Sequence, residues 1–313
     1  MSDNDSDVPE CDCASESGLL SISETLDLCN ISYSREATIA AFKEYFLFLT
    51  ELYLDPEQIV FPPTEGWEEI TITNLRPLGK TDEVIELLRH LPYIKPSGLC
   101  HDIAPHCHLA DYSSIARTIL SPETFFIKDQ NPAEFYSAVT HGIWDNIPPH
   151  VIGLAIGREN AMFLDTHLGV IYWPGGNFHP AAVGYAMHPD APFQAIRDES
   201  FDYAPEEEMW RNAGSGLKCG WGIEEFFEML KFHFRELNFL PTSGRRVEDN
   251  FAVVREGEEH PNDDIYRAKK VVVEVFRQHG WPDMLVYQKD ECMEAVARKV
   301  EELERQDPNI MLS

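Results

Sequence analysis

The sequence predicts an α+β protein in which a central antiparallel sheet, a meander, is packed by helices and followed by a C-terminal helical hairpin. Apolar residues recur at three- and four-residue steps in several stretches, as they do in amphipathic helices. Three short runs of β-forming residues, separated by turn residues, lie between 151 and 173. With 313 residues, of which 43% are hydrophobic, the chain is long enough for one large domain with an extension.

The first helices are expected before residue 92. In TIAAFKEYFLFLTELYL the side chains of Phe42, Phe46 and Leu49 fall on one face, and the prolines that follow should end this helix near Leu54. The segment TDEVIELLRHLPYI offers Thr81 as the N-cap of a second helix, whose first-turn acids suit the helix dipole.

The meander is expected in VIGLAIGRENAMFLDTHLGVIYW, which begins at residue 151. GREN and THLG separate its three runs and supply glycine or asparagine where a tight reversal needs positive φ. In the last run Val170 and Tyr172 point one way and Ile171 and Trp173 the other, which predicts a sheet covered on both faces. The Asp165 carboxylate is expected to cap backbone amides of the second turn.

Three further helices are predicted after residue 220. WGIEEFFEMLKFHFRELNFLP carries one apolar stripe and should lie on the sheet, and the stretches 263–279 and 288–306 should form the helical hairpin. The predicted organisation is therefore a disordered acidic tail (1–30), an α+β domain (31–241), a polar linker (242–261) and a C-terminal helical extension (262–313).

The net charge of −29 restricts the partners, because such a field repels phosphate backbones and anionic membrane surfaces. We therefore expect no nucleic-acid and no membrane partner. The acidic surface either only maintains solubility or docks another protein, and basic proteins would complement it. The acidic start of the chain and its seven scattered cysteines predict an intracellular, cytoplasmic protein, with a nuclear location left open.

The densest group of metal-capable residues is LCHDIAPHCHLAD, which spans Cys100 to Asp111 and holds His101, His106 and His108. Histidine, cysteine and aspartate are ligands that zinc prefers, so a metal-dependent hydrolase or oxygenase that uses this cluster is one alternative. No second ligand pair follows at zinc-ribbon or zinc-finger spacing, and a proline interrupts the group, which favours a solvated surface loop.

Other catalytic signatures are missing from the sequence. There is no G-x-S-x-G, no phosphate-binding P-loop and no G-x-G-x-x-G motif. Asp165, His167 and His179 do not have the spacing of a cupin metal site. We therefore assign no catalytic, cofactor-binding or metal-binding residue and expect no cofactor. A small-ligand binder whose pocket walls include Tyr172 and Trp173 is a further alternative.

Two segments carry a family resemblance. AMFLDTHLGVIYW has Asp165 and Gly169 at its reversal, and IEEFFEML carries the apolar positions Ile223, Phe226, Phe227 and Leu230. With the order of elements over about 35–240, they resemble the SUKH superfamily, which includes fungal regulators of cell-wall assembly and bacterial immunity proteins that neutralise toxins.

The chain also resembles a group of uncharacterised fungal proteins along most of its length, including FRQHGWPDMLVYQKDECMEAV. The long connection from 179 to 219 and the C-terminal hairpin depart from the SUKH pattern. The resemblance implies an α+β fold that binds other proteins, without catalytic residues to carry over. The leading expectation is therefore a non-enzymatic protein-interaction and regulatory module with an acidic surface.

Overall fold

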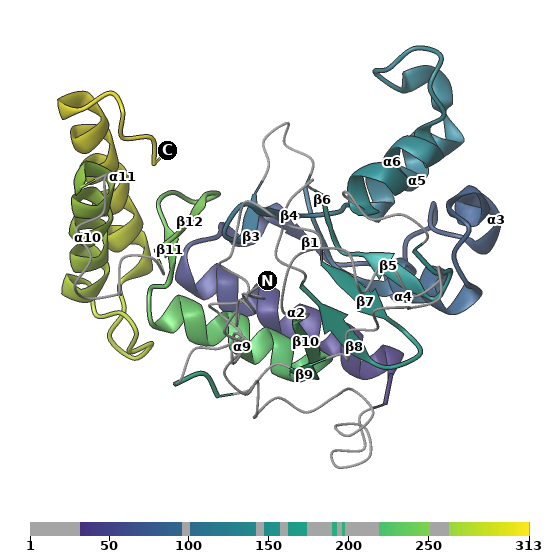
Figure 1. Cartoon of the computed structure of the whole chain (residues 1–313), viewed down its shortest axis with the longest axis horizontal. Coiled ribbons are helices and arrows are strands. Elements are labelled where there is room, and N and C mark those ends of the chain that lie inside the picture. The colour runs from purple at the N-terminus through teal and green to yellow at the C-terminus, as the bar shows by residue number, and fades with distance from the viewer. Residues whose placement is uncertain are drawn as a thin grey trace, which may run out of the picture.

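The computed structural model describes residues 32–95, 101–141, 147–156, 162–173, 190–192, 196–197, 219–250 and 263–312. Helices surround several small antiparallel sheets, and the last two helices pack against each other at one end of the molecule (Figure 1), which confirms the predicted α+β class. The predicted tail 1–30 lies outside the described residues.

The helices follow the apolar periodicity of the sequence. They are α2 (Arg35–Leu52), α3 (Ile72–Leu75), α4 (Asp82–His90), α5 (Tyr112–Leu120), α6 (Pro132–His141), α9 (Ile223–Arg235), α10 (Asp263–Gln278) and α11 (Lys289–Gln306), with 3-10 turns η1 (Pro56–Gln58), η2 (Arg76–Leu78) and η3 (Pro122–Thr124). The predicted cap of α4 is confirmed, because the hydroxyl of Thr81 accepts a hydrogen bond from the backbone N–H of Val84.

The largest sheet contains the predicted meander. Its strands are β5 (Val151–Gly153), β7 (Phe163–Asp165), β8 (Val170–Tyr172), β10 (Cys219–Gly222) and β9 (Ile196–Arg197), and they pair antiparallel in the order β5-β7-β8-β10-β9. All three residues of β8 are buried, so the expectation of a sheet covered on both faces is confirmed. The first separator, 157–160, lies outside the described residues.

The turn between β7 and β8 has the predicted chemistry. The Asp165 carboxylate accepts hydrogen bonds from the backbone N–H groups of His167 and Leu168, and Gly169 has a φ of 72°. A Cβ at position 169 would also lie 2.8 Å from the backbone nitrogen of Tyr33. Both the backbone angle and the space therefore require glycine here.

Two parts of the chain differ from the sequence prediction. Trp221, expected at the start of a helix, lies in β10 opposite Ile171, and α9 begins two residues later, because the sheet buries this indole ring. The run from 151 to 156 is divided, since the second part, β6 (Ala155–Ile156), pairs with another sheet formed by β3 (Asp102–Ala104) and β4 (Cys107–Leu109). One short segment thus joins two sheets.

Two strand pairs complete the fold: β1 (Ile59–Val60) with β2 (Tyr93–Ile94), and β11 (Phe239–Pro241) with β12 (Val247–Asp249). β12 lies inside the stretch 242–261 that was expected to be a linker. Val247 is fully buried and its strand pairs with β11, so the first part of that stretch packs into the domain. The part from 251 to 261 lies outside the described residues.

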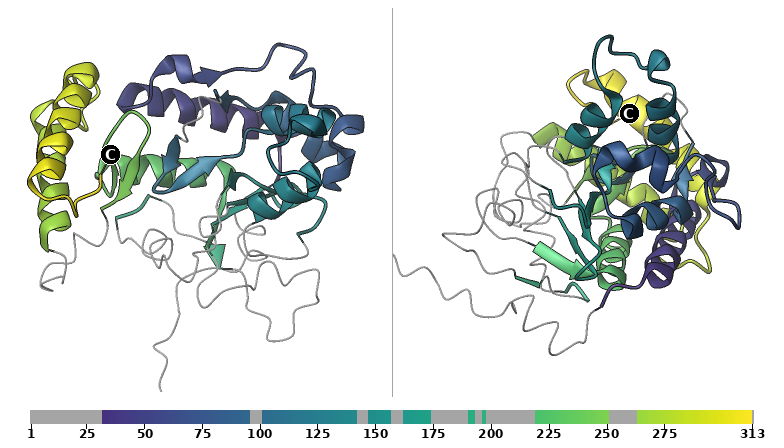
Figure 2. Two further views of the ribbon diagram at one scale, coloured as in Figure 1. Left: turned by 90° about the horizontal axis from the view of Figure 1, so that it is seen from above. Right: turned by 90° about the vertical axis from the view of Figure 1, so that its right-hand side faces the viewer.

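The core is organised around α2 and α9, which lie side by side in the same direction (Figure 2). Phe42 contacts Phe227 with ring centroids 4.8 Å apart, and nearly two turns later Phe48 contacts Phe234 at 6.1 Å. The predicted apolar stripe of the 223–237 region is buried, as expected. Within the described residues, no helix is both long enough and apolar enough to cross a membrane.

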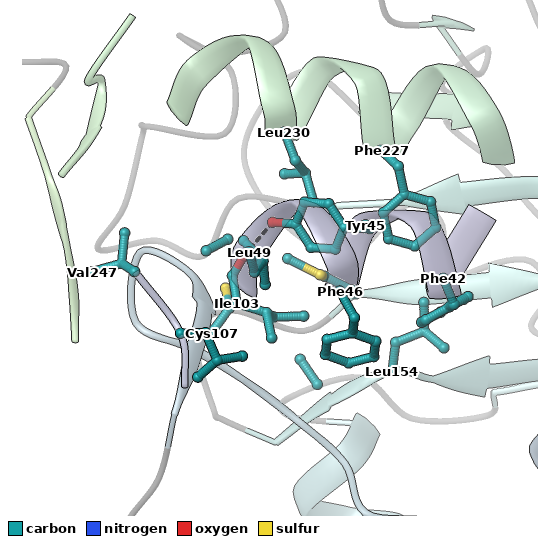
Figure 3. Close-up of a cluster of buried hydrophobic side chains, with 14 of the residues drawn as sticks. Phe42, Tyr45, Phe46, Leu49, Ile103, Cys107, Leu154, Phe227, Leu230 and Val247 are labelled. Atoms are coloured by element: carbon teal, nitrogen blue, oxygen red, sulfur yellow. Dashed lines mark hydrogen bonds between the residues drawn. The ribbon is translucent and has the colours of Figure 1, made fainter. Parts of the chain in front are cut away.

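Tyr45 joins this helix pair to the β3–β4 hairpin. Its ring lies between the side chains of α9 and the hairpin, and its hydroxyl donates a hydrogen bond to the backbone carbonyl of Ile103 (Figure 3). Cys107 is fully buried in the same cluster. The hydrophobic core is therefore continuous from the helix pair into the region that the sequence singled out for its histidines.

Candidate functional site

The histidine-rich segment is a β-hairpin, and this corrects the prediction of an irregular solvated loop. Asp102 pairs with His108 across β3 and β4, and His106 occupies the turn with a φ of 56°. The first strand is completely buried, because Ile103 and Ala104 pack into the core. The sequence did not reveal the strands, since each has three residues and the apolar positions alternate with histidines.

Asp102 is the central polar group of this hairpin. Its side chain is buried, one carboxylate oxygen accepts a hydrogen bond of 2.9 Å from the backbone N–H of Val247, and the other lies 2.9 Å from Nδ1 of His108. The imidazole of His108 is 36% exposed. The carboxylate thus lies beside the imidazole ring of His108, and its bond to Val247 holds β12 against β3.

This pair alone does not make a nucleophilic site. Burial and the neighbouring Asp102 raise the pKa of the Cys107 thiol well above its usual value, so this sulfur stays protonated. Among the described residues no group of three or more His, Cys, Asp or Glu side chains is arranged to hold a metal ion. The hairpin separates its histidines rather than gathering them around one point, and Cys100 lies outside the described residues.

The meander places a second acid beside histidines. The rings of His150 and His167 are stacked, with centroids 3.8 Å apart, and Nε2 of His150 lies 3.8 Å from the buried Asp165 carboxylate. The same carboxylate caps the turn, so its role in the structure is the predicted one. His179 lies outside the described residues.

Tyr172 and Trp173, the expected walls of a ligand pocket, are core side chains. Each is 3% exposed, and Trp173 contacts Phe226 and Phe239 with ring centroids 6.2 Å away in both cases. Trp173 thus packs between the sheet and α9, whereas Tyr172 is buried on the opposite face of β8.

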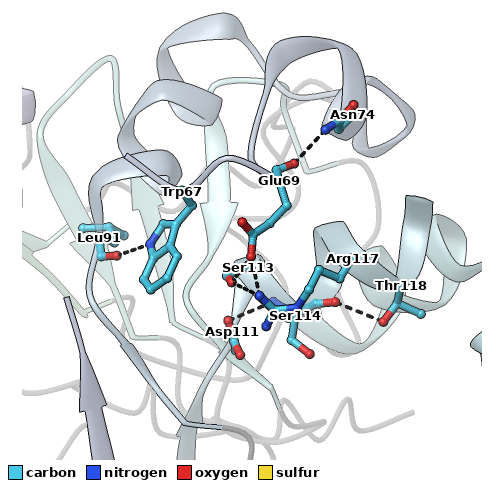
Figure 4. Close-up of polar contacts among 9 residues, drawn as sticks. All are labelled: Trp67, Glu69, Asn74, Leu91, Asp111, Ser113, Ser114, Arg117 and Thr118. Atoms are coloured by element: carbon cyan, nitrogen blue, oxygen red, sulfur yellow. Dashed lines mark hydrogen bonds and ion pairs between the residues drawn. The ribbon is translucent and has the colours of Figure 1, made fainter. Parts of the chain in front are cut away.

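A polar cluster that the sequence did not suggest lies near α3 and α5 (Figure 4). Glu69 accepts hydrogen bonds from the hydroxyl of Ser113 and from the guanidinium of Arg117, and these contacts lower the pKa of its carboxyl against the opposing effect of burial. The Asp111 carboxylate caps α5 through the backbone N–H of Ser114. The hydroxyl of Ser113 donates to the Glu69 carboxylate and accepts a hydrogen bond of 2.8 Å from the guanidinium of Arg117, so the cluster attaches α5 to the segment that carries Glu69.

An apolar turn, formed by residues 284–286, connects α10 and α11. Met284, Leu285 and Val286 are 42%, 94% and 57% exposed. Asp283 fixes their backbone, since its side chain accepts a hydrogen bond from the N–H of Leu285 and its carbonyl accepts from Val286 and Tyr287. In the sequence, these three consecutive apolar residues form a run without helical periodicity. The sequence pattern indicated only the end of a helix at this point, so the exposure of the run was not predicted.

The apolar turn is anchored to the ends of the two core helices, beside which it lies in Figure 1. The indole N–H of Trp281 donates to the carbonyls of Phe234 and Arg235 at the end of α9, at 3.1 Å each. At the end of α2, the hydroxyl of Tyr287 donates to the carbonyl of Leu52 at 2.8 Å. These donors bind carbonyls in the last turns of the two helices, where a helix leaves several carbonyls without intrahelical partners.

Lys289 completes this anchoring. Its ammonium donates to the carbonyls of Thr50 and Leu54, at 2.7 and 2.8 Å. Burial lowers the pKa of Lys289, whereas the neighbouring Asp290 and Asp55 oppose that shift. Asp55, Asp283 and Asp290 are all exposed. The backbone of the apolar turn is therefore held in place, and three exposed aspartates lie on or near the segments that hold it.

Comparison of the chain with protein-family models, curated protein sequences and solved structures gives no match.

Proposed function

We propose that this chain is a non-enzymatic, intracellular protein-interaction module that acts in regulation and docks its partner through the apolar turn 284–286. The observation that carries the proposal is the exposure of Leu285, at 94%, on a backbone that three side-chain anchors hold in place. A leucine held this way loses little conformational freedom on binding, which favours its use as an interface anchor.

The charge around the turn indicates the chemistry of the partner. Asp55, Asp283 and Asp290 are exposed near the turn, and the whole chain carries −29. A protein partner with an apolar pocket rimmed by Lys and Arg would complement both features, and the charges would mainly speed the encounter. This mode of action agrees with the SUKH-like resemblance, which we retain as part of the proposal.

Paired variants test the docking site. Wild type, Leu285→Ser and Leu120→Ser are compared as baits in native cell extract, since Leu120 is a second exposed leucine, 50% exposed, on α5. We expect a protein that wild type and Leu120→Ser retain and Leu285→Ser loses by at least about tenfold, which corresponds to about 1.4 kcal/mol of binding free energy. Equal retention by all three baits would contradict docking through this turn.

The recovered protein is then purified and its association measured by stopped flow. Raising the salt concentration from about 50 to about 500 mM should lower the association rate and leave the dissociation rate nearly unchanged, because exposed charges are screened beyond the Debye length. A rate that does not vary with salt would contradict the basic character of the partner.

A further inference from the structure

The connection between α5 and α6 and the first residues of α6 carry four aromatic rings that touch one another, here called the aromatic cluster: Phe125, Phe126, Phe135 and Tyr136. The ring centroid of Phe125 lies 4.8 Å from that of Phe126 and 5.3 Å from that of Phe135. Phe126 and Phe135 lie 5.6 Å apart with their planes at 88°, and Tyr136 lies 5.4 Å from Phe135. The ring contacts therefore hold the residues after η3 against α6, at the edge of the molecule that lies opposite α10 and α11 (Figure 1).

Phe126 is the exposed member of the aromatic cluster. It is 73% exposed, whereas its neighbour Phe125 is 8% exposed. Phe125 thus packs this segment onto α6, and Phe126 adds a ring of which most of the surface faces solvent. The face of an aromatic ring carries partial negative charge and attracts an ammonium or guanidinium group placed within about 6 Å of its centroid.

Three carboxylates flank the aromatic cluster. Glu123 belongs to η3, Asp129 lies in the connection and Glu134 is in the first turn of α6, and all three are exposed. The amide of Asn131 donates a hydrogen bond of 3.3 Å to the carboxylate of Glu134, which holds this acid on the side of the connection. With these three acids and one lysine, the stretch 122–136 has a charge of −2.

We propose that the aromatic cluster binds an arginine or lysine side chain of a partner protein, with the cation on the exposed face of Phe126 and the three carboxylates around it. Ring faces and carboxylates both attract a cation, so the two features of this surface favour the same chemistry. Arginine should bind better than lysine, because its planar guanidinium stacks on a ring and is less strongly hydrated.

The charge of the flanking acids disfavours two other occupants. A second copy of this chain would bring the same carboxylates opposite one another, and such like-charge contacts oppose association. An uncharged apolar partner would cover the ring but would remove water from carboxylates without pairing them. The aromatic cluster lies far from the apolar turn 284–286 in Figure 1, and the proposal does not depend on the proposed function.

The test measures binding of dye-labelled peptides to the full chain by fluorescence anisotropy at about 150 mM salt. The first peptide has two arginines among glycines, the second has citrulline in place of arginine, which keeps the shape without the charge, and the third has leucine. We expect wild type to bind the arginine peptide at least about tenfold more tightly than either of the others.

Matched variants assign the binding to the aromatic cluster. Phe126→Leu keeps an apolar side chain but removes the ring, and it should weaken binding of the arginine peptide by about tenfold. Phe61→Leu changes another exposed phenylalanine, 44% exposed and next to β1, and should bind as wild type does. The triple variant Glu123→Gln, Asp129→Asn, Glu134→Gln leaves the rings in place and should also bind more weakly. Thermal unfolding confirms that each variant is folded.

Three results would overturn the proposal. Equal affinity of wild type and Phe126→Leu for the arginine peptide would mean that the acidic surface as a whole attracts it. Equal affinity of wild type for the leucine and arginine peptides would identify a surface for apolar groups. Dimers of wild type that Phe126→Leu abolishes in analytical ultracentrifugation would identify a second copy as the occupant.

Discussion

Lys289, at the end of the helix pair, and Lys80, just before α4, are both lysines whose pKa burial lowers, but their partners differ. Lys289 donates to two carbonyls at 2.7 and 2.8 Å, whereas Lys80 donates to one carbonyl at 3.4 Å. The end of α2 supplies several unpaired carbonyls and the negative pole of a helix dipole. The segment at Pro148 supplies one carbonyl at 3.4 Å. We therefore expect Lys289 to stabilise the fold and Lys80 to contribute little.

The largest effect on this comparison is expected from Lys289→Met. Loss of two hydrogen bonds and of the favourable position at the helix end should lower the free energy of unfolding by about 2 kcal/mol. Urea denaturation measures this value. Lys43→Met, an exposed change on the same helix pair, should stay within about 0.5 kcal/mol of wild type. Similar losses in both variants would mean that the carbonyl contacts contribute nothing specific.

The next effect concerns pH. The pKa of His141 is about 3 in the folded chain and 6.5 in the unfolded reference, so between these values the unfolded chain binds more protons. The free energy of unfolding therefore keeps its full value above pH 6.5 with respect to this histidine. It decreases as the pH falls, by about 1 kcal/mol between pH 6 and 5. The variant His141→Phe should lack this part of the pH dependence. Parallel stability curves for wild type and variant over that range would refute the assignment.

The smallest change in the free energy of unfolding is expected from Lys80→Met. It should be an increase, whereas Lys289→Met should cause a decrease. At pH 7 in chloride buffer the variant should equal wild type or exceed it by up to about 1 kcal/mol, because a poorly solvated ammonium is removed. The folded pKa of Lys80, about 8, lies below the reference of 10.5, so wild-type stability should rise between these pH values and that of the variant should not. A loss above about 1 kcal/mol would show that Lys80 is as well paired as Lys289.

Local signals in the sequence were sufficient for much of the fold. Thr81 identified the start of α4 because an N-cap needs only its own side chain and the next three residues. Gly169 and Asp165 identified the turn of the meander for the same reason, since the whole motif lies within five residues. The two C-terminal helices were found from periodicity and from the glycine and proline that separate them.

Features that depend on distant partners were not predictable. The Asp102 carboxylate has its backbone donor in Val247, 145 positions later. The same contact explains why part of the stretch 242–261 packs into the domain. Lys80 and His141 carried no signal at all, because an isolated lysine and a histidine at a helix end are ordinary in any sequence. Their significance comes only from the packing of α6 on β5.

The anchoring of the apolar turn also has a consequence for the timing of folding during synthesis. Lys289 and Leu54 are 235 positions apart in the chain. At a translation rate of about 5–20 residues per second, α2 leaves the ribosome on the order of 10 to 50 seconds before the lysine that covers its last carbonyls is made. Throughout this interval the carbonyls at the end of α2 have solvent or chaperones as their only available partners in place of Lys289. The domain therefore reaches its full stability only after translation of the 281–289 segment.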